Sequence, residues 1–203
     1  MKTVMDLIAD CERALDRAKR GRSSLPETAL NVSGMSSPWV RHLLNNLCAS
    51  AHTFVEVGSY HGSTLLSAML GNPTLEAHAI EHWRQYGGRQ VFDENMARFN
   101  LSPIVHVDDF RNVLIQSPID VFFYDGAHDE HDQYEAICHF SHQLRSPAKI
   151  IVDDWNWERV QSGTKRGMMD SRMTVHQSWE LLSDHNGDLK TWWNGLFLAV
   201  VTP

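Results

Sequence analysis

The chain has little cysteine and no long apolar stretch. Its 203 residues include 3 cysteines, which lie far apart and form no Cys-x-x-Cys pair. We therefore expect reduced thiols, not a disulfide framework or a cysteine-based zinc site. No apolar run approaches the ~20 residues that a membrane span requires. The first twenty residues mix acids and bases with apolar positions, unlike a signal peptide. These absences predict a cytoplasmic protein without a membrane partner.

Positive charge is also scarce, because 18 Lys and Arg residues stand against 25 Asp and Glu residues, for a net charge of −7. Phosphate binding needs a positive field, so this balance predicts no nucleic-acid partner. The phosphate-binding pattern G-x-x-x-x-G-K-[ST] is absent. A dinucleotide pattern G-x-G-x-x-G starting at Gly58 would need a second glycine where Tyr60 stands. The turn at 58–62 is therefore poorly suited to phosphate.

Short apolar runs alternate with helical stretches from residue 53 onward. We expect strands at 53–57, 76–80, 104–107, 120–125 and 149–153, with helices near 62–70, 88–99 and 131–144. Such alternation is typical of a parallel sheet that is covered by helices on both faces. The predicted fold is α/β, a Rossmann-like doubly wound sheet of seven strands, mostly parallel with an antiparallel C-terminal hairpin strand.

The two ends of the chain complete this prediction. Residues 1–50, with helices at 1–20 and 38–49, are expected to form an N-terminal helical cap or lid, and residues 51–203 the main part of a single domain. After residue 153 we expect a polar loop over 158–170, either a lid or a solvated loop, and a helix at 171–184. Two β-like runs joined by Asn194 and Gly195 predict the terminal hairpin.

Acidic residues stand at or near the end of every expected parallel strand. They are Glu56, Glu81, Asp108, Asp109, Asp125, Asp153 and Asp154. Each alone is compatible with a solvated turn or a helix cap. Together they would meet at one edge of the sheet, where open α/β sheets bind their ligands. Glu56 lies two residues before Gly58, where a carboxylate repels phosphate and suits a cationic ligand.

The run E-x-G-x-x-x-G at 56–62 resembles the first motif of the class I methyltransferases, which bind S-adenosylmethionine (SAM). The resemblance implies that Glu81 binds the ribose hydroxyls, and that Asp108 and Asp109 lie beside the adenine. The cofactor residues that it implies are Glu56, Gly58, Ser59, Tyr60, Gly62, Ser63, Glu81, His82, Trp83, Asp108, Asp109 and Asp125.

Two further stretches, DVFFYDGAHDEHDQY at 120–134 and IIVDDWNW at 150–157, resemble the divalent-metal-dependent O-methyltransferases of the catechol, caffeoyl-CoA and macrocin type. The resemblance implies that Asp125, Asp153 and Asp154 bind Mg²⁺ or another divalent cation. His128 would be the catalytic base, where the catechol type has a lysine. The expected reaction is methyl transfer to a hydroxyl of a small-molecule acceptor, and the resemblance allows a homodimer.

Three other interpretations stay open at this point. The first is a methyltransferase of the same fold that needs no metal, the second an NAD-type oxidoreductase, and the third a non-catalytic protein that binds SAM. Zinc binding by the histidines near 128–142 is a minor alternative, since a zinc site usually has a more defined His and Cys set. We expect these histidines to lie on an exposed or half-buried helix face.

Overall fold

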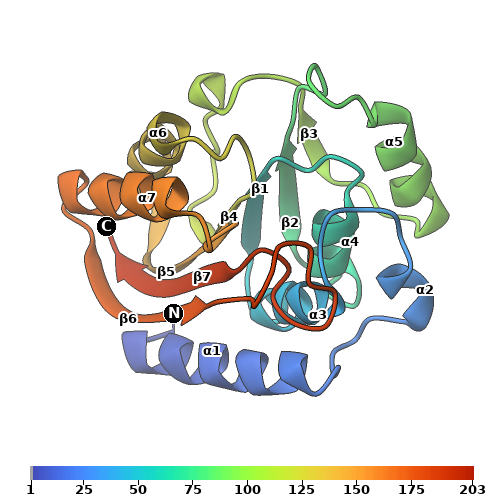
Figure 1. Cartoon of the computed structure of the whole chain (residues 1–203), viewed down its shortest axis with the longest axis horizontal. Helices are drawn as coiled ribbons and strands as arrows, with labels where there is room; N and C mark the ends of the chain where they lie inside the picture. Colours follow the sequence, from blue (N-terminus) through green and yellow to red (C-terminus); the bar gives the residue numbers. More distant parts are fainter. Residues whose placement is uncertain (1) are drawn as a thin grey trace.

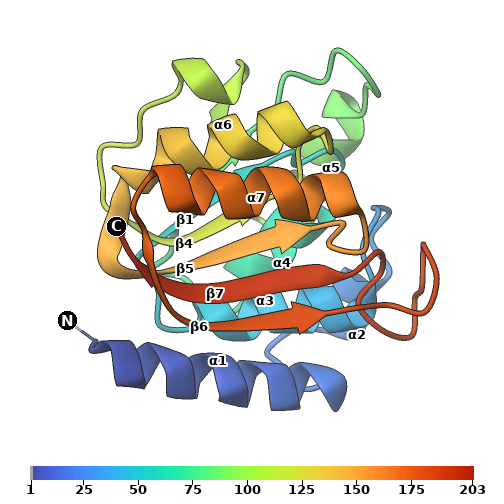
Figure 2. The same cartoon turned by 60° about the vertical axis from the view of Figure 1, so that its left-hand side comes forward.

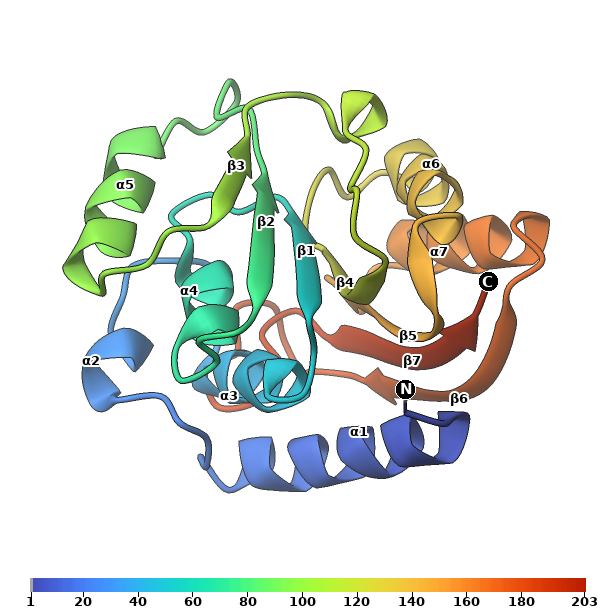
Figure 3. The same ribbon diagram turned by 180° about the vertical axis from the view of Figure 1, so that it is seen from behind.

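A computed structural model describes residues 2–203 and shows one sheet in the order β3-β2-β1-β4-β5-β7-β6 (Figure 1). The strands are β1 (Thr53–Val57), β2 (Glu76–Ile80), β3 (Ile104–His106), β4 (Ile119–Tyr124), β5 (Leu144–Asp153), β6 (Thr174–Leu181) and β7 (Leu196–Thr202). Strands β1 to β5 are parallel, whereas β7 is antiparallel to both β5 and β6. Figure 3 shows β2 between β1 and β3. The predicted fold class is confirmed.

Helices cover both faces of the sheet (Figure 2). One face carries α1 (Val4–Lys19), α2 (Glu27–Leu30), α3 (Pro38–Cys48), α4 (Ser63–Met69) and α5 (Arg89–Arg98). The other carries the short helix η1 (Phe110–Asn112), α6 (Glu130–Ser141) and α7 (Glu158–Asp170). Because successive strand residues point to opposite faces, Phe54 belongs to the first core and Val55 to the second.

Local sequence accounts for the helix starts in the N-terminal segment. Thr3 and Asp6 form a capping box at the start of α1. Ser37 caps α3 by accepting a hydrogen bond from the Val40 N–H, and Pro38 occupies the first turn, as the sequence predicts. Helix α1 packs against α3, β5 and β7, and lies beneath β6 and β7 in Figure 1.

The expected loop at 158–170 is wrong, because this segment is helix α7. Its buried residues Val160, Gly163, Gly167 and Met168 recur at helical spacing and face α6. A Cβ on Gly163 would lie 2.3 Å from the Glu130 carbonyl oxygen. The two glycines therefore permit close packing of two helices, although in the sequence they look like loop residues.

The expected helix at 171–184 is also wrong, because residues 174–181 form strand β6 at the edge of the sheet. Its side chains are mostly exposed, so the alternation of buried and exposed positions is weak. The predicted antiparallel C-terminal strand exists as β7, but the hairpin expected at Asn194 and Gly195 is wrong, because β7 pairs with β6 and not with the run before Asn194. Residues 182–195 form a loop that contains one isolated bridge, between Asp188 and Trp193.

Within residues 2–203, no helix combines the length and apolar composition that crossing a bilayer would require.

Candidate functional site

A cavity of about 760 Å³ lies at the carboxyl ends of the parallel strands. Thirteen of the residues that the sequence singles out line it: Gly58, Ser59, Tyr60, Ser63, Glu81, His82, Trp83, Asp108, Asp109, Asp125, His128, Asp153 and Asp154. Glu56 and Gly62 do not line it; both are buried beneath its wall. The strand-end acids therefore meet at one edge of the sheet, as parallel topology requires.

The turn after β1 contacts the end of β4 directly. Gly58 has φ +92°, and a Cβ built on it would lie 1.9 Å from the Asp125 carbonyl oxygen. Only glycine fits this approach without a shift of the backbone. The turn is held further by a hydrogen bond from the Gly58 N–H to the Ile80 carbonyl oxygen, 3.0 Å. Gly58 thus brings the turn after β1 into contact with the ends of β2 and β4.

Glu56 is fully buried in β1, and neither carboxylate oxygen has a hydrogen-bond partner among the described residues. Burial raises the pKa of this carboxyl to about 7, against the opposing effect of the nearby Ser59 and Thr64 hydroxyls. Ser59 and Thr64 themselves line the cavity. A buried carboxyl without donors is costly unless it stays protonated or a cation lies nearby. Glu56 therefore favours a cationic ligand in this part of the cavity.

Glu81 follows β2 and connects the turn after β1 to the turn after β2 through hydrogen bonds. Its carboxylate accepts hydrogen bonds from the backbone N–H groups of Tyr60, at 3.3 Å, and Trp83, at 2.8 Å. The Trp83 indole in turn donates to the Tyr60 carbonyl oxygen, at 2.8 Å. These bonds orient the carboxylate and leave it further capacity to accept from ligand hydroxyls. Trp83 is 9 % exposed and its ring packs against Phe92, so most of its surface is unavailable to a ligand.

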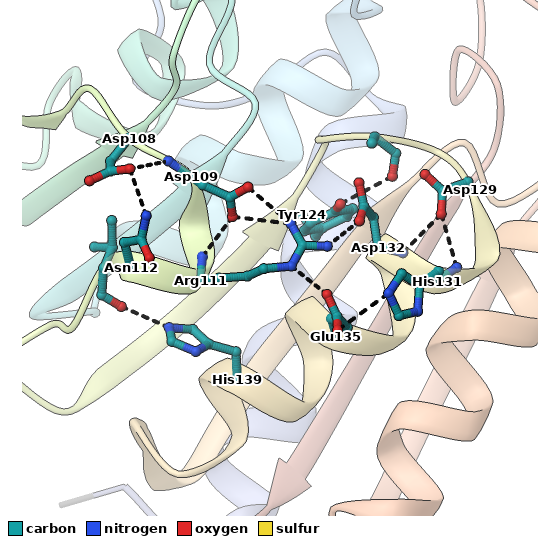
Figure 4. A network of polar contacts seen from close by, with 12 residues as sticks. Asp108, Asp109, Arg111, Asn112, Tyr124, Asp129, His131, Asp132, Glu135 and His139 are labelled. Atoms are coloured by element: carbon teal, nitrogen blue, oxygen red, sulfur yellow. Dashed lines mark hydrogen bonds and ion pairs between the residues drawn. The ribbon is translucent and has the colours of Figure 1, made fainter.

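After β3, Arg111 fixes the position of the cavity wall that contains Asp109 (Figure 4). Its guanidinium forms ion pairs with Asp109, Asp132 and Glu135, which connects η1 to α6. Burial alone would raise the pKa of Asp109, but the Arg111 backbone N–H and guanidinium outweigh it and hold this pKa below its usual value. Asp108 also has a lowered pKa, because Asn112 and the Asp109 N–H donate to it. Both carboxylates are thus held ionised.

The ends of β4 and β5 bring three carboxylates and an imidazole together. His128 Nε2 lies 3.0 Å from Asp154 Oδ2 and 4.0 Å from Asp125 Oδ1. Burial and the neighbouring carboxylates raise the pKa of Asp125 and Asp153 well above the usual range. Asp153 is 3 % exposed, and its Oδ1 is buried without a hydrogen-bond partner in the part of the chain that the structure describes. This part of the cavity is short of donors and positive charge.

The donor set at this point fits a hard divalent cation, since carboxylate oxygens are the ligands that Mg²⁺ prefers. The unpartnered Asp153 oxygen and the crowding of like charges are what such a cation would relieve. As they stand, no three His, Cys, Asp or Glu side chains in residues 2–203 are arranged as a ready metal site. Both oxygens of Asp154 already have partners, His128 and Asn194, so a cation would share one of them.

The two histidines of α6, His131 and His139, have separate partners and do not contact each other. His131 is exposed and pairs with Glu135, and His139 Nε2 hydrogen-bonds to the Val113 carbonyl oxygen at 2.8 Å. The expected exposed or half-buried helix face is confirmed. These contacts give no support to the minor zinc alternative.

Several cavity residues have no signal in the sequence. Trp193 and Asn194 reach it from the loop between β6 and β7. Met35 also lines it, and it belongs to the segment 33–39, which the sequence suggests as a lid. Four residues that line the cavity have a positive φ despite their side chains: Tyr60 (43°), Trp83 (51°), Asp154 (57°) and Trp193 (63°). Such backbone strain gathers at binding sites. This strain depends on tertiary contacts, so no local sequence pattern predicts it.

Comparison with known proteins agrees with this site. Residues 55–155 match a family model described as a methyltransferase domain. No curated protein sequence matches the chain.

Solved structures resemble the whole chain. The O-methyltransferase TomG from Streptomyces achromogenes, in complex with SAM, is 20 % identical, with a TM-score of 0.61 over 96 % of this chain and 90 % of that one. An O-methyltransferase from Bacillus cereus in complex with SAH is 16 % identical, with a TM-score of 0.62 over 96 % of this chain and 91 % of that one. At this identity the likeness concerns the fold.

The family match covers the strand ends that build the cavity, and the fold around it is the one on which those enzymes hold their cofactor. The chain is a class I SAM-dependent methyltransferase.

Proposed function

We propose that the enzyme transfers the methyl group of SAM to a hydroxyl of a small molecule, and that a divalent cation, Mg²⁺ in the first place, assists. The observation that carries this proposal is the group of three carboxylates beside His128 at the carboxyl ends of β4 and β5. TomG and the Bacillus cereus protein, which share the fold, are O-methyltransferases.

The cofactor would occupy the half of the cavity formed by β1, β2 and β3. The turn at 58–63 would hold its amino-acid part above Glu56, whose buried carboxyl suits the cationic end. Glu81 would accept from the ribose hydroxyls with the capacity that the Tyr60 and Trp83 amides leave free. Asp109, oriented by Arg111, would lie beside the adenine with His82 and Asp108.

The reaction needs an acceptor oxygen that has lost its proton or is losing it. The oxygen forms a bond to the methyl carbon while the bond from sulfur to this carbon breaks, which leaves S-adenosylhomocysteine (SAH). A bound divalent cation would lower the pKa of the acceptor hydroxyl. Asp125, Asp153 and Asp154 would hold that cation, and His128 would take the hydroxyl proton.

Asp154 has a second use in this scheme. If the Nε2–H of neutral His128 donates to Asp154 Oδ2, the lone pair lies on Nδ1, which is buried and has no partner among the described residues, so the side chains that cover it would have to move before an acceptor hydroxyl could reach it. A carboxylate that orients an imidazole in this way supports proton transfer without any metal. This pair favours a second candidate, an O-methyltransferase that needs no cation, in which Asp125 and Asp153 shape the pocket.

One titration series separates the candidates. SAH is titrated calorimetrically into the protein with Mg²⁺ and with a chelator, and methylation of a panel of phenols and sugar alcohols is then measured under both conditions. SAH binding with chelator-sensitive methylation supports the metal-assisted reaction, whereas chelator-resistant methylation supports the Asp154 and His128 pair alone. Absence of SAH binding under every condition would contradict both candidates.

A further inference from the structure

The first turn of α7 places a cation that is unpaired within residues 2–203 in the exposed part of the cavity lining. Three basic residues lie in this helix. Lys165 pairs with Glu180 at 3.3 Å and Arg166 with Glu130 at 2.9 Å, and neither lines the cavity. Arg159 lines the cavity, is exposed, and has no ion pair or hydrogen bond from its guanidinium to any residue of 2–203. Its charge is available to a ligand.

Trp157 lies between this cation and the reacting end of the site. The centroid of its ring is 5.4 Å from that of His128, with the two rings nearly perpendicular at 85°. The Arg159 guanidinium carbon lies 4.8 Å from the Trp157 ring centroid, as in a cation–π contact. Because both groups lie so close to one half-buried indole, a single small molecule can reach the imidazole and the guanidinium along this wall.

The charges around the cavity make Arg159 distinctive. The strand-end acids give the interior a negative lining. The other arginine that lines the cavity, Arg111, is committed to three carboxylates. An anionic group on an acceptor would therefore meet like charge beside the strand-end acids and opposite charge at Arg159. Arg159 can orient such an acceptor with its anionic end outward and its far end toward His128.

We propose that Arg159 binds a carboxylate of the methyl acceptor, and that the acceptor is a hydroxylated aromatic acid. Its ring would pack against Trp157 and its hydroxyl would lie beside His128. A planar guanidinium matches a carboxylate through two parallel hydrogen bonds, and an aromatic ring suits an indole wall. This inference rests on the proposed function, because it names the acceptor of the same site.

The test compares pairs of ligands that differ only in the charge of one group. Dihydroxybenzoate and dihydroxycinnamate are each paired with their methyl esters, and all four are titrated calorimetrically into SAH-saturated protein with Mg²⁺. We expect each acid to bind about tenfold or more tightly than its ester, as a charge-assisted hydrogen bond at a partly exposed site would give. Higher salt should weaken binding of the acids and leave the esters unchanged.

Two variants locate the effect. Arg159→Met should weaken binding of the acids about tenfold and leave the esters within about twofold. Arg166→Met is the matched control, since it removes a similar charge from the same helix outside the cavity, and it should change neither class. Both variants should retain wild-type affinity for SAH, which shows that the fold and the cofactor half are intact.

Three outcomes would overturn the inference while SAH still binds. These are acids and esters of equal affinity, an Arg159→Met variant that treats both as the wild type does, and no binding of any acid. Failure of the wild-type protein to bind SAH is a separate result, which contradicts the proposed function itself.

Discussion

Asp108 and Asp109, after β3, are surrounded by donors, whereas Asp125 and Asp153, at the ends of β4 and β5, face each other with few. Asn112 and Arg111 lower the pKa of the first pair, and burial with mutual repulsion raises the pKa of the second. A carboxylate whose partners come from the protein is preorganised for recognition. Carboxylates left without partners are arranged for a cation or a proton that arrives with the reaction. In the proposed function, this difference separates a cofactor half of the cavity, at the ends of β1, β2 and β3, from an acceptor half, at the ends of β4 and β5.

Replacement of Asp153 should have the largest effect and should fall on the acceptor half alone. If a cation assists as proposed, we expect Asp153→Asn to lower kcat/KM for methyl transfer by about 100-fold or more, because one ligand of that cation would be lost. Affinity for SAH, measured by calorimetry on the same variant, should stay near the wild-type value. Full activity in this variant would contradict a catalytic role for Asp153.

Gly58 tests the contact that joins the two halves. Gly58→Ala should lower the free energy of unfolding by about 2 kcal/mol or more, since the new Cβ meets the Asp125 carbonyl oxygen and φ is positive. Gly87→Ala is the matched control, because Gly87 also has a positive φ of +65° but no atom lies within 4 Å of the added Cβ. Urea denaturation of both variants measures the difference. Equal destabilisation would mean that the close approach is unimportant.

Glu56 is an exception to this comparison, because it is a carboxyl without hydrogen-bond donors among the described residues, in the proposed cofactor half. Its pKa of about 7 in the folded protein exceeds the 4.5 of an ordinary glutamate. Between these values the folded state keeps a proton that the unfolded state releases, so its contribution to the free energy of unfolding falls as pH rises. The slope is about 1.4 kcal/mol per pH unit at most. Glu56→Gln should remove this fall, which urea denaturation of both proteins at pH 5, 6 and 7 would detect.

The contribution would stop changing above the folded pKa, so the gap between variant and wild type should level off there. A gap that does not depend on pH would show that Glu56 stays ionised in the folded protein.

Arg111 should have the smallest effect, confined to the cofactor half. Its ion pairs are partly exposed, so each contributes little to stability. We expect Arg111→Met to raise the Kd of SAH about three- to tenfold by releasing Asp109, and to leave kcat at saturating SAM close to wild type. Arg20→Met, which breaks an exposed pair on α1, should leave the Kd of SAH unchanged. A fall in kcat without a change in Kd would assign Arg111 to the acceptor half instead.

The parallel part of the fold could be read from the sequence because its signals are local. Buried runs such as 53–57 and 120–124 alternate with helices, and glycine and acid residues mark where strands end. Local signals failed after Asp153. There, Gly163 and Gly167 serve contact with α6, and the exposed side chains of β6 carry little periodicity.

By itself the sequence determined which residues reach the edge of the sheet, since a strand that ends on an acid must place it at the carboxyl end. Glu81, Asp109, Asp125 and Asp153 all follow this rule. Only the tertiary structure decided which strand-end acids have partners: Arg111 for Asp109, His128 for Asp154, and none within residues 2–203 for the Asp153 Oδ1 atom. The physical reason is that pKa and ligand affinity depend on neighbours brought in from distant parts of the chain, which no local pattern encodes.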